Sequence, residues 1–309
     1  MRRSLPCTRL AASWLLLATL ASCVSTPAVV TTPAVIALQR IAVDARPNGI
    51  AIRPTDGAVF IADDVSNTVL SSSDGKLFAR YAALPVVAGQ PNSVSQLAFA
   101  NSGVLLVARF GFGTTGTVFE IPAIDTTRAL AGLDPTRRRL GLAVVGPGQF
   151  LSTWFVKNEG HPAQGGLSLI TYDAASGKAQ ERDVMSGLGK PIGVAVLGDQ
   201  VFVSDQADNT IVGASLAALL RSTQAIAPTD IVARVNDPDL MAVDENATLH
   251  TKCDTHSVCQ IASNGAVTIL AGDFHDARGV AIDPTRHLLY VVDRAAAGRT
   301  SYERMYRLK

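Results

Sequence analysis

Apolar and polar positions follow one phrase that recurs along the chain. Residues 279–294, GVAIDPTRHLLYVVDR, have near-copies in GIAIRPTDGAVFIADD from Gly49 and GVAVLGDQVFVSDQAD from Gly193. Each copy has a small residue, a short apolar run, a turn and a second apolar run with an acidic end. Two β-rich runs joined by such a turn predict a β-hairpin.

Six copies of the phrase can be aligned, and further strands are predicted after each copy. The copies start about 35 to 50 residues apart, which is the period of propeller blades. They occupy residues 48–63, 95–109, 140–154, 192–205, 239–253 and 278–293. Inside/outside alternation is blurred in the apolar runs, as expected when both faces of each sheet are buried. The pattern predicts an all-β fold, a six-bladed β-propeller of four-stranded antiparallel blades.

The two ends of the chain predict how the ring closes. After the sixth copy only one more strand fits, at residues 302–309, so the last blade lacks its outer strand. Residues 35–49 have the character of an outer strand that runs into the next blade. We therefore expect the N-terminal strand to complete the last blade, which removes exposed sheet edges. Five or seven blades are the alternatives if residues 124–139 hide or lose a strand. Separately, the spacing of apolar residues at 215–223 predicts a short helix.

The N-terminal segment has the composition of an export signal. It carries three arginines, an apolar stretch from Leu10 to Leu20 and small residues before Cys23, and it is too short for a permanent membrane span. The segment LASC ending at Cys23 also resembles the lipobox of bacterial lipoproteins, whose cleavage leaves a diacylated cysteine as the first residue. An ordinary secretory signal cut nearby is the alternative. No Asp follows the cysteine, so the resemblance implies the outer membrane, with the domain facing the periplasm.

These features divide the chain into three parts. We expect residues 1–22 to be a lipoprotein signal peptide, with Cys23 as the lipidation site. Residues 23–34 are rich in Ser, Thr and Pro without charge, which predicts an extended tether. Residues 35–309 then form a single propeller domain, held at the membrane through the lipid anchor only.

The remaining cysteines predict a disulfide. Cys7 leaves with the signal, and Cys253 and Cys259 are separated by DTHSV across a predicted hairpin. Outside the cytoplasm such a pair is well placed to form a disulfide. A metal pair is the alternative, although the spacing differs from that of zinc sites.

The amino-acid composition limits the classes of binding partner. Charged residues are 17% and apolar residues 48% of the chain, and the net charge is +1. No broad positive field is present, so we expect no nucleic-acid binding. We expect a monomer that binds a small molecule or an envelope protein.

The segment GAVTILAGDFHDARGVAIDPTRHLLYVVDR, residues 265–294, resembles the NHL-repeat and SMP-30/gluconolactonase/LRE-like propellers. The resemblance extends from about Val35 to the end of the chain. It implies one divalent cation, Ca²⁺ or Mg²⁺, in the central channel, held by oxygen ligands. The segments PNG and PDLMAVD resemble the two family phrases that supply an Asn and an Asp ligand, which places these roles on Asn48 and Asp239. The order of the two phrases differs from the family, and no N-terminal Glu ligand has an equivalent here.

The six copies also predict which residues meet at the mouth of the channel. The positions equivalent to Asn48 are Ser95, Leu140, Ile192, Asp239 and Arg278. Asn48, Ser95, Asp239 and Arg278 form a polar set of mixed charge, which suits an oriented polar ligand. Arg278 lies between Asn48 and Asp239 in the predicted ring, and we expect it to pair with Asp239 rather than tolerate a nearby dication.

Acidic residues close several second strands, and they have two interpretations. Asp205 and Asp293 are candidate catalytic bases, because a carboxylate in a suitable environment can move a proton. The same residues, with Asp63 and Asp64, can instead cap turns by accepting backbone N–H bonds. The GFGTTG segment at residues 111–116 matches a phosphate-binding pattern but joins two strands, so we interpret it as a turn. The loop at residues 157–166, with His161, is the best candidate for a lid.

Two functions follow from these observations. The first is a lipid-anchored envelope propeller that serves as a binding platform for a small molecule or a protein. The alternative is a metal-dependent lactonase or related hydrolase, in which the ion polarises an ester carbonyl and activates water. In that case Asn48 and Asp239 hold the metal, and Asp205 or Asp293 is the base.

Overall fold

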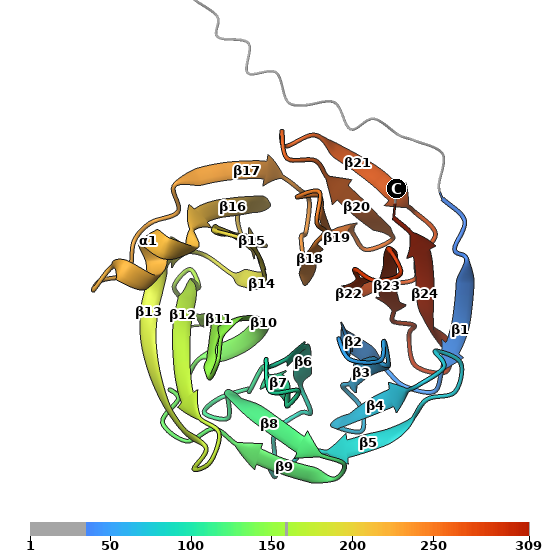
Figure 1. The fold of residues 1–309 in the computed structure, drawn as a ribbon, viewed down its shortest axis with the longest axis horizontal. Coiled ribbons are helices and arrows are strands. Elements are labelled where there is room, and N and C mark those ends of the chain that lie inside the picture. The colour runs from blue at the N-terminus through green and yellow to red at the C-terminus, as the bar shows by residue number, and fades with distance from the viewer. Residues whose placement is uncertain (1–34, 158–159, 309) are drawn as a thin grey trace, which may run out of the picture.

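A computed structural model describes residues 35–157 and 160–308. The chain forms six four-stranded antiparallel sheets arranged in a ring around a common centre (Figure 1). The six-bladed all-β fold predicted from the repeated phrase is therefore confirmed. The predicted signal peptide, Cys23 and the tether lie outside the described residues.

In each of the first five blades, successive strands of the chain are neighbours in the sheet. The first three blades are β2 (Pro47–Ile52), β3 (Val59–Asp63), β4 (Thr68–Ser72) and β5 (Ala79–Ala83); β6 (Val94–Phe99), β7 (Leu105–Arg109), β8 (Thr117–Ala123) and β9 (Thr126–Ala129); and β10 (Arg138–Gly146), β11 (Gln149–Val156), β12 (Gln164–Asp173) and β13 (Lys178–Leu188). β9 supplies the fourth strand of the second blade. Residues 124–139, where the repeat is weak, therefore neither add nor remove a blade.

The other three blades include the one that closes the ring. They are β14 (Pro191–Leu197), β15 (Gln200–Asp205), β16 (Thr210–Ser215) and β17 (Asp230–Arg234); β18 (Met241–Val243), β19 (Leu249–Asp254), β20 (Ser257–Ile261) and β21 (Val267–Ala271); and β22 (Ala277–Asp283), β23 (Leu288–Asp293), β24 (Ser301–Arg307) and β1 (Gln39–Val43). β1 pairs antiparallel with β24, from Gln39 opposite Met305 to Val43 opposite Ser301. The predicted closure by the N-terminal strand is confirmed.

Among the described residues, one short helix interrupts the strands. α1 (Leu216–Arg221) follows β16, and the Ser215 side chain caps it by accepting a hydrogen bond from the Ala218 N–H. In the part of the chain that the structure describes, no helix has the length and apolar character needed to cross a bilayer.

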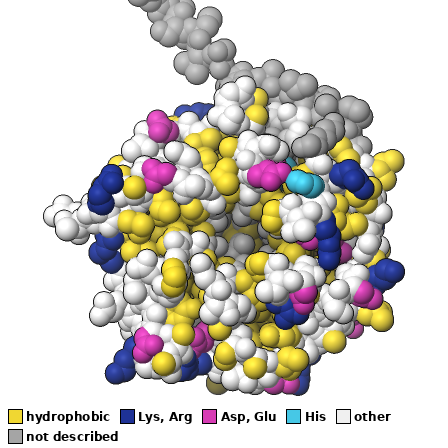
Figure 2. All heavy atoms as spheres, viewed as in Figure 1, with side chains coloured by type: hydrophobic (Ala, Val, Ile, Leu, Met, Phe, Trp, Pro, Cys, Tyr) yellow, Lys and Arg dark blue, Asp and Glu magenta, His cyan; other side chains and the backbone are white. Residues whose placement is uncertain are grey.

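The core lies between neighbouring blades. One cluster joins Phe60 of the first blade to Leu97, Val107 and Phe119 of the second, all of them buried. Each sheet buries both faces in this way, which explains why its strands read as continuous apolar runs. Figure 2 shows hydrophobic side chains gathered around the hollow at the centre of the ring.

The small residue that opens the phrase has a steric cause. A Cβ atom on Gly49 would lie 2.1 Å from the carbonyl oxygen of Ser95 in the next blade. A Cβ atom on Gly279 would lie 2.7 Å from the carbonyl oxygen of Asn48, across the closure of the ring. At these two positions the first strands of neighbouring blades approach each other so closely that a side chain would collide with the backbone of the next blade.

Hydroxyl side chains on second strands connect adjacent blades. Ser204 Oγ accepts a hydrogen bond from Gly193 N–H at 2.7 Å and donates to the carbonyl of Asp239 in the next blade at 2.8 Å. Thr153 makes the equivalent pair between the third and fourth blades. These bonds satisfy backbone groups at the crowded channel, where strand pairing is interrupted.

The predicted disulfide is present. Cys253 on β19 and Cys259 on β20 are bonded, with a Cα–Cα distance of 5.7 Å. The disulfide ties together the two strands of one hairpin.

Candidate functional site

A cavity of about 500 Å³ opens at the end of the channel where the first strands begin. Two sets of equivalent positions form most of its wall. The inner set comes from the starts of the first strands and contains Asn48, Leu140, Ile192, Asp239 and Arg278. The outer set comes from the ends of the second strands and contains Asp64, Phe110, Phe155, Gln206 and Arg294. The cavity therefore exists only when all blades are in place.

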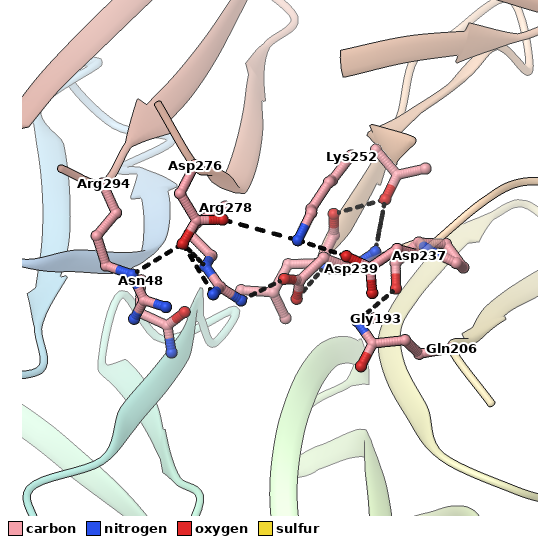
Figure 3. A network of polar contacts seen from close by, with 12 residues as sticks. Asn48, Gly193, Gln206, Asp237, Asp239, Lys252, Asp276, Arg278 and Arg294 are labelled. Carbon is pink, nitrogen blue, oxygen red and sulfur yellow. Dashed lines mark hydrogen bonds and ion pairs between the residues drawn. The ribbon is translucent and has the colours of Figure 1, made fainter. Parts of the chain in front are cut away.

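Seven charged side chains of the fifth, sixth and first blades form one ionic network beside the cavity, and Figure 3 labels all of them except Asp64. Its members are Asp64, Asp237, Asp239, Lys252, Asp276, Arg278 and Arg294. Arg278 contacts Asp239 Oδ2 at 2.9 Å and Asp276 Oδ2 at 2.9 Å. Burial opposes the charge of Arg278, yet the two carboxylates keep its pKa above the ordinary value. The predicted pairing of Arg278 with Asp239 is confirmed.

Asp276 connects the rest of the network. It lies 3.3 Å from Arg294 Nε and 3.7 Å from Lys252 Nζ, and Lys252 also contacts Asp237 at 2.7 Å. Arg294 in turn contacts Asp64 Oδ2 at 3.0 Å. Each cation thus lies between carboxylates of different segments, which holds the mouths of three blades together.

Asp64 is the titratable group of the cavity wall whose protonation is most affected by its surroundings. Burial raises the pKa of Asp64 to about 6, against the opposing effect of Arg294. The network holds four carboxylates and three cations. It is neutral when Asp64 carries a proton and has a charge of −1 when Asp64 is ionised.

The opposite side of the cavity is apolar. An aromatic wall is formed by Phe110, Phe112 and Phe155, with ring centroids 4.9 Å apart for the first pair and 5.7 Å for Phe110 and Phe155. Leu140 and Ile192 pack beside it. The second to fourth blades thus supply an apolar surface that faces the ionic network.

Three further cations line this cavity. The Arg138 guanidinium carbon lies 5.2 Å from the ring centroid of Phe110, and Lys190 Nζ lies 6.0 Å from that of Phe155. Lys157 is exposed at the edge of the cavity, close to His161 in the sequence. None of the three cations has an ion pair with an acidic side chain in residues 35–157 and 160–308.

The four residues predicted at the channel mouth have different environments. Asn48, Asp239 and Arg278 line the cavity, and Asn48 Nδ2 donates to the carbonyl of Val94 at 2.9 Å. Ser95 is fully buried, does not line the cavity, and its hydroxyl has no hydrogen-bond partner among the described residues. The cavity wall has Ser93 and Asn92 in its place.

The two candidate bases do not line the cavity, although each directly precedes a residue that does. The carboxylate of Asp205 accepts hydrogen bonds from Gly189 N–H and Lys190 N–H, both at 2.8 Å. The carboxylate of Asp293 accepts from His275 N–H at 2.8 Å and pairs with buried Arg304. Both aspartates are buried, and neither lines the cavity. Their contacts are those of the capping role considered for them.

The donor set does not fit a divalent cation. Asp239 is committed to Arg278 through Oδ2 and accepts Leu240 N–H through Oδ1 at 2.9 Å. A dication between Asn48 and Asp239 would have to displace or repel the Arg278 guanidinium. Within the described residues, no group of three or more His, Cys, Asp or Glu side chains is placed to hold a metal ion.

Sequence reasoning missed the outer set of cavity residues. The signal was present at the ends of the second strands, where Asp63 caps the turn and the next residue, Asp64, faces the cavity. Asp205 and Asp293 cap turns in the same way, and the residues that follow them, Gln206 and Arg294, line the cavity. The residue after each capping position was therefore the better candidate.

Comparisons with known proteins show the fold. No protein-family model matches the sequence, and no curated protein matches it. A gluconolactonase from Xanthomonas campestris matches with a TM-score of 0.65 and 15% identity, covering 85% of this chain and 86% of that one. Regucalcin, a calcium-binding protein from Agrobacterium tumefaciens, has a TM-score of 0.63 and 13% identity, with 84% and 91% covered. A luciferin-regenerating enzyme has a TM-score of 0.63 and 14% identity, with 85% and 92% covered. The chain is thus a six-bladed β-propeller with the fold of gluconolactonase and regucalcin.

Proposed function

We propose that this protein is a ligand-binding platform of the cell envelope, which holds a small amphipathic molecule at the channel mouth without a metal ion. The observation that carries the proposal is the division of the cavity into two chemically different sides. The ionic network of three blades faces the aromatic wall and the aliphatic residues of the other three. A cavity of this kind orients a molecule that has one polar and one apolar end.

The size and rigidity of the cavity support this function. A volume of about 500 Å³ is within the usual range of small-molecule sites. Arg278 and Arg294 are held by several carboxylates each, so the polar groups are already placed before a ligand enters. Preorganised groups lose less entropy on binding.

A lactonase or related hydrolase is the alternative. The names of the neighbours favour it, since one is a gluconolactonase and one a calcium-binding protein. Asp64 would be the acid or base of such an enzyme, because it lines the cavity and burial raises its pKa to about 6. The commitment of Asp239 to Arg278 and Leu240 argues against the metal-dependent form.

Metal analysis and a lactonase assay separate the two functions. For the binding platform, we expect no stoichiometric divalent ion after gentle purification and no rise in melting temperature on adding Ca²⁺. We also expect no hydrolysis of glucono-1,5-lactone, with or without chelator. A stoichiometric ion together with activity that chelation abolishes would establish the lactonase instead.

A neutral amphipathic probe tests binding directly. We expect 2-naphthalenemethanol to bind the wild-type protein in calorimetry and to lose binding in Ile192→Trp, which fills the cavity. Leu197→Trp is the matched control, because Leu197 ends the same strand at the other end of the channel. Unchanged binding in Ile192→Trp would place the probe elsewhere and contradict the proposed site.

The proposed location is the periplasmic face of the outer membrane, with Cys23 as the lipid anchor. The support is the export signal and the LASC segment of the sequence.

A further inference from the structure

We infer that the ligand of this cavity is an organic anion, a carboxylate carried on a planar unsaturated or aromatic body, and that Arg138 and Lys190 select it. This inference rests on the proposed function and names the class of ligand for the same site. It depends on three observations: the charge that remains after internal pairing, the position of Arg138, and the shape of the apolar side.

The charges of the cavity wall do not cancel. Among the described residues, five cations line it, namely Arg138, Lys157, Lys190, Arg278 and Arg294, against the two carboxylates of Asp64 and Asp239. Arg278 and Arg294 are compensated within the ionic network. The other three cations have no acidic partner among the side chains that the structure describes. The excess positive charge therefore lies on the aromatic side of the cavity, and it favours an anion there.

Arg138 has unused hydrogen-bond donors at this surface. Its guanidinium carbon lies 5.2 Å, 5.6 Å and 5.8 Å from the ring centroids of Phe110, Phe112 and Phe155. These contacts position the guanidinium, but its side chain donates no hydrogen bond to any residue in the described ranges. A planar guanidinium presents two parallel N–H groups, which match the two oxygens of a carboxylate.

Lys190 is a second cation on the same side. Its ammonium group donates to Gln206 Oε1 and lies 6.0 Å from the ring centroid of Phe155. Burial lowers the pKa of Lys190, so this cation is partly desolvated, and no carboxylate of the described residues contacts it. A ligand anion would supply the missing counter-charge.

The apolar side determines the shape of the ligand body. Phe110 and Phe155 meet at an interplanar angle of 68°, and Leu140 and Ile192 continue the surface between the blades. A flat ring system can lie against this surface while its carboxylate reaches Arg138. The cavity of about 500 Å³ has room for a molecule of this class.

Calorimetry with four matched probes tests the inference. The probes are 2-naphthoate, 2-naphthalenemethanol, 2-naphthylmethylammonium and acetate, at one ionic strength and pH 7. We expect 2-naphthoate to bind at least tenfold more tightly than the alcohol, the ammonium more weakly than the alcohol, and acetate without measurable affinity. 2-Naphthoate reports the combined contribution of the negative charge and the ring system to affinity. The alcohol and the ammonium keep the ring system without the negative charge, and acetate keeps the carboxylate without the ring system.

Variants connect the preference to the named residues. In Arg138→Gln we expect 2-naphthoate to lose at least tenfold in affinity, whereas the alcohol changes less than threefold. Lys190→Gln should show the same selective loss, and it carries the test if Arg138→Gln does not fold. The control is Lys76→Gln, which removes one positive charge in the turn between β4 and β5 and should leave all four affinities unchanged.

The outcomes separate the inference from the proposed function. Equal affinity for acid and alcohol, or tighter binding of the ammonium, overturns the anion preference but leaves an amphipathic binding site. A preference for the acid that survives in both Arg138→Gln and Lys190→Gln overturns the role of these residues. If none of the naphthalene probes binds, the inference and the proposed function both fail.

Discussion

Glu303 is predicted to make the stability of the ring fall as pH rises. This residue lies on β24, the strand that pairs with β1 to close the last blade. Its side chain is fully buried, and neither carboxylate oxygen has a hydrogen-bond partner in the described part of the chain. Burial raises the pKa of Glu303 from 4.5 to about 8. A buried carboxyl without a partner is tolerated only in its neutral form.

The sign and size of the effect follow from proton linkage. Between pH 4.5 and 8 the folded protein keeps a proton on Glu303 that the unfolded chain has lost. The free energy of unfolding is therefore highest below pH 4.5 and decreases as pH rises through 8, by on the order of 1 kcal/mol for each pH unit. The full contribution is about 5 kcal/mol, which is a large part of the stability of a typical domain.

Chemical denaturation of the wild-type protein and Glu303→Gln at pH 5, 6.5 and 8 tests this prediction. Glutamine has the same shape and does not ionise, so the variant should be less stable than or equal to the wild type at pH 5 and more stable at pH 8. The difference between the two proteins cancels the titration of other groups, including Asp64. The exposed Glu245 provides the control Glu245→Gln. Parallel pH profiles for wild type and Glu303→Gln would refute the reasoning.

Four further predictions concern the cavity, the fold and the location. In calorimetry, the affinity of the wild-type protein for 2-naphthoate should fall by roughly three- to tenfold between pH 5 and 7.5, as Asp64 ionises near pH 6. The affinity of Asp64→Asn should stay constant over this range. An identical fall in both proteins would exclude Asp64 as the cause. Reduction of the Cys253–Cys259 disulfide, which spans a sequence separation of 6, should lower the free energy of unfolding by about 2 kcal/mol in urea denaturation, and an unchanged midpoint would contradict this. Gly49→Ala should lower the free energy of unfolding by about 2 to 3 kcal/mol, because its Cβ would lie 2.1 Å from a carbonyl oxygen of the next blade. A melting temperature equal to that of the wild type would disprove the close approach. Cys23→Ala should move the protein from the membrane fraction to the soluble fraction on immunoblots, and continued membrane attachment would rule out the lipid anchor.

Much of the fold could be predicted because each blade has the same local structural requirements. A typical blade has a small residue at the channel, an apolar first strand, a turn and an apolar second strand, and these features recur as the phrase that begins at Gly49, Gly193 and Gly279. Ring closure also followed from the chain ends, because an unpaired sixth blade and a lone N-terminal strand complete each other. Such features depend on local propensity and alternation, which one sequence displays directly.

The candidate site was only partly predictable, and its inner set was the accessible part. Equivalence among the copies placed Asn48, Asp239 and Arg278 at one mouth, and the charges alone predicted that Arg278 pairs with Asp239. The same reasoning placed Ser95 at the mouth, but Ser95 is fully buried and does not line the cavity, which equivalence among the copies does not reveal.

The sequence by itself predicted the blades, the closing strand and, with stated alternatives, the number of blades and the disulfide, because each arises from neighbours in the chain or from repetition. Only the tertiary structure decided that Asp63 caps a turn while Asp64 faces the cavity, and that Arg138 has no acidic partner among the described side chains. These outcomes depend on which side chains of different blades meet across the channel. Segments such as those of Asp64 and Arg294 are 230 residues apart in the chain, so their contact is a property of the closed ring rather than of any local pattern.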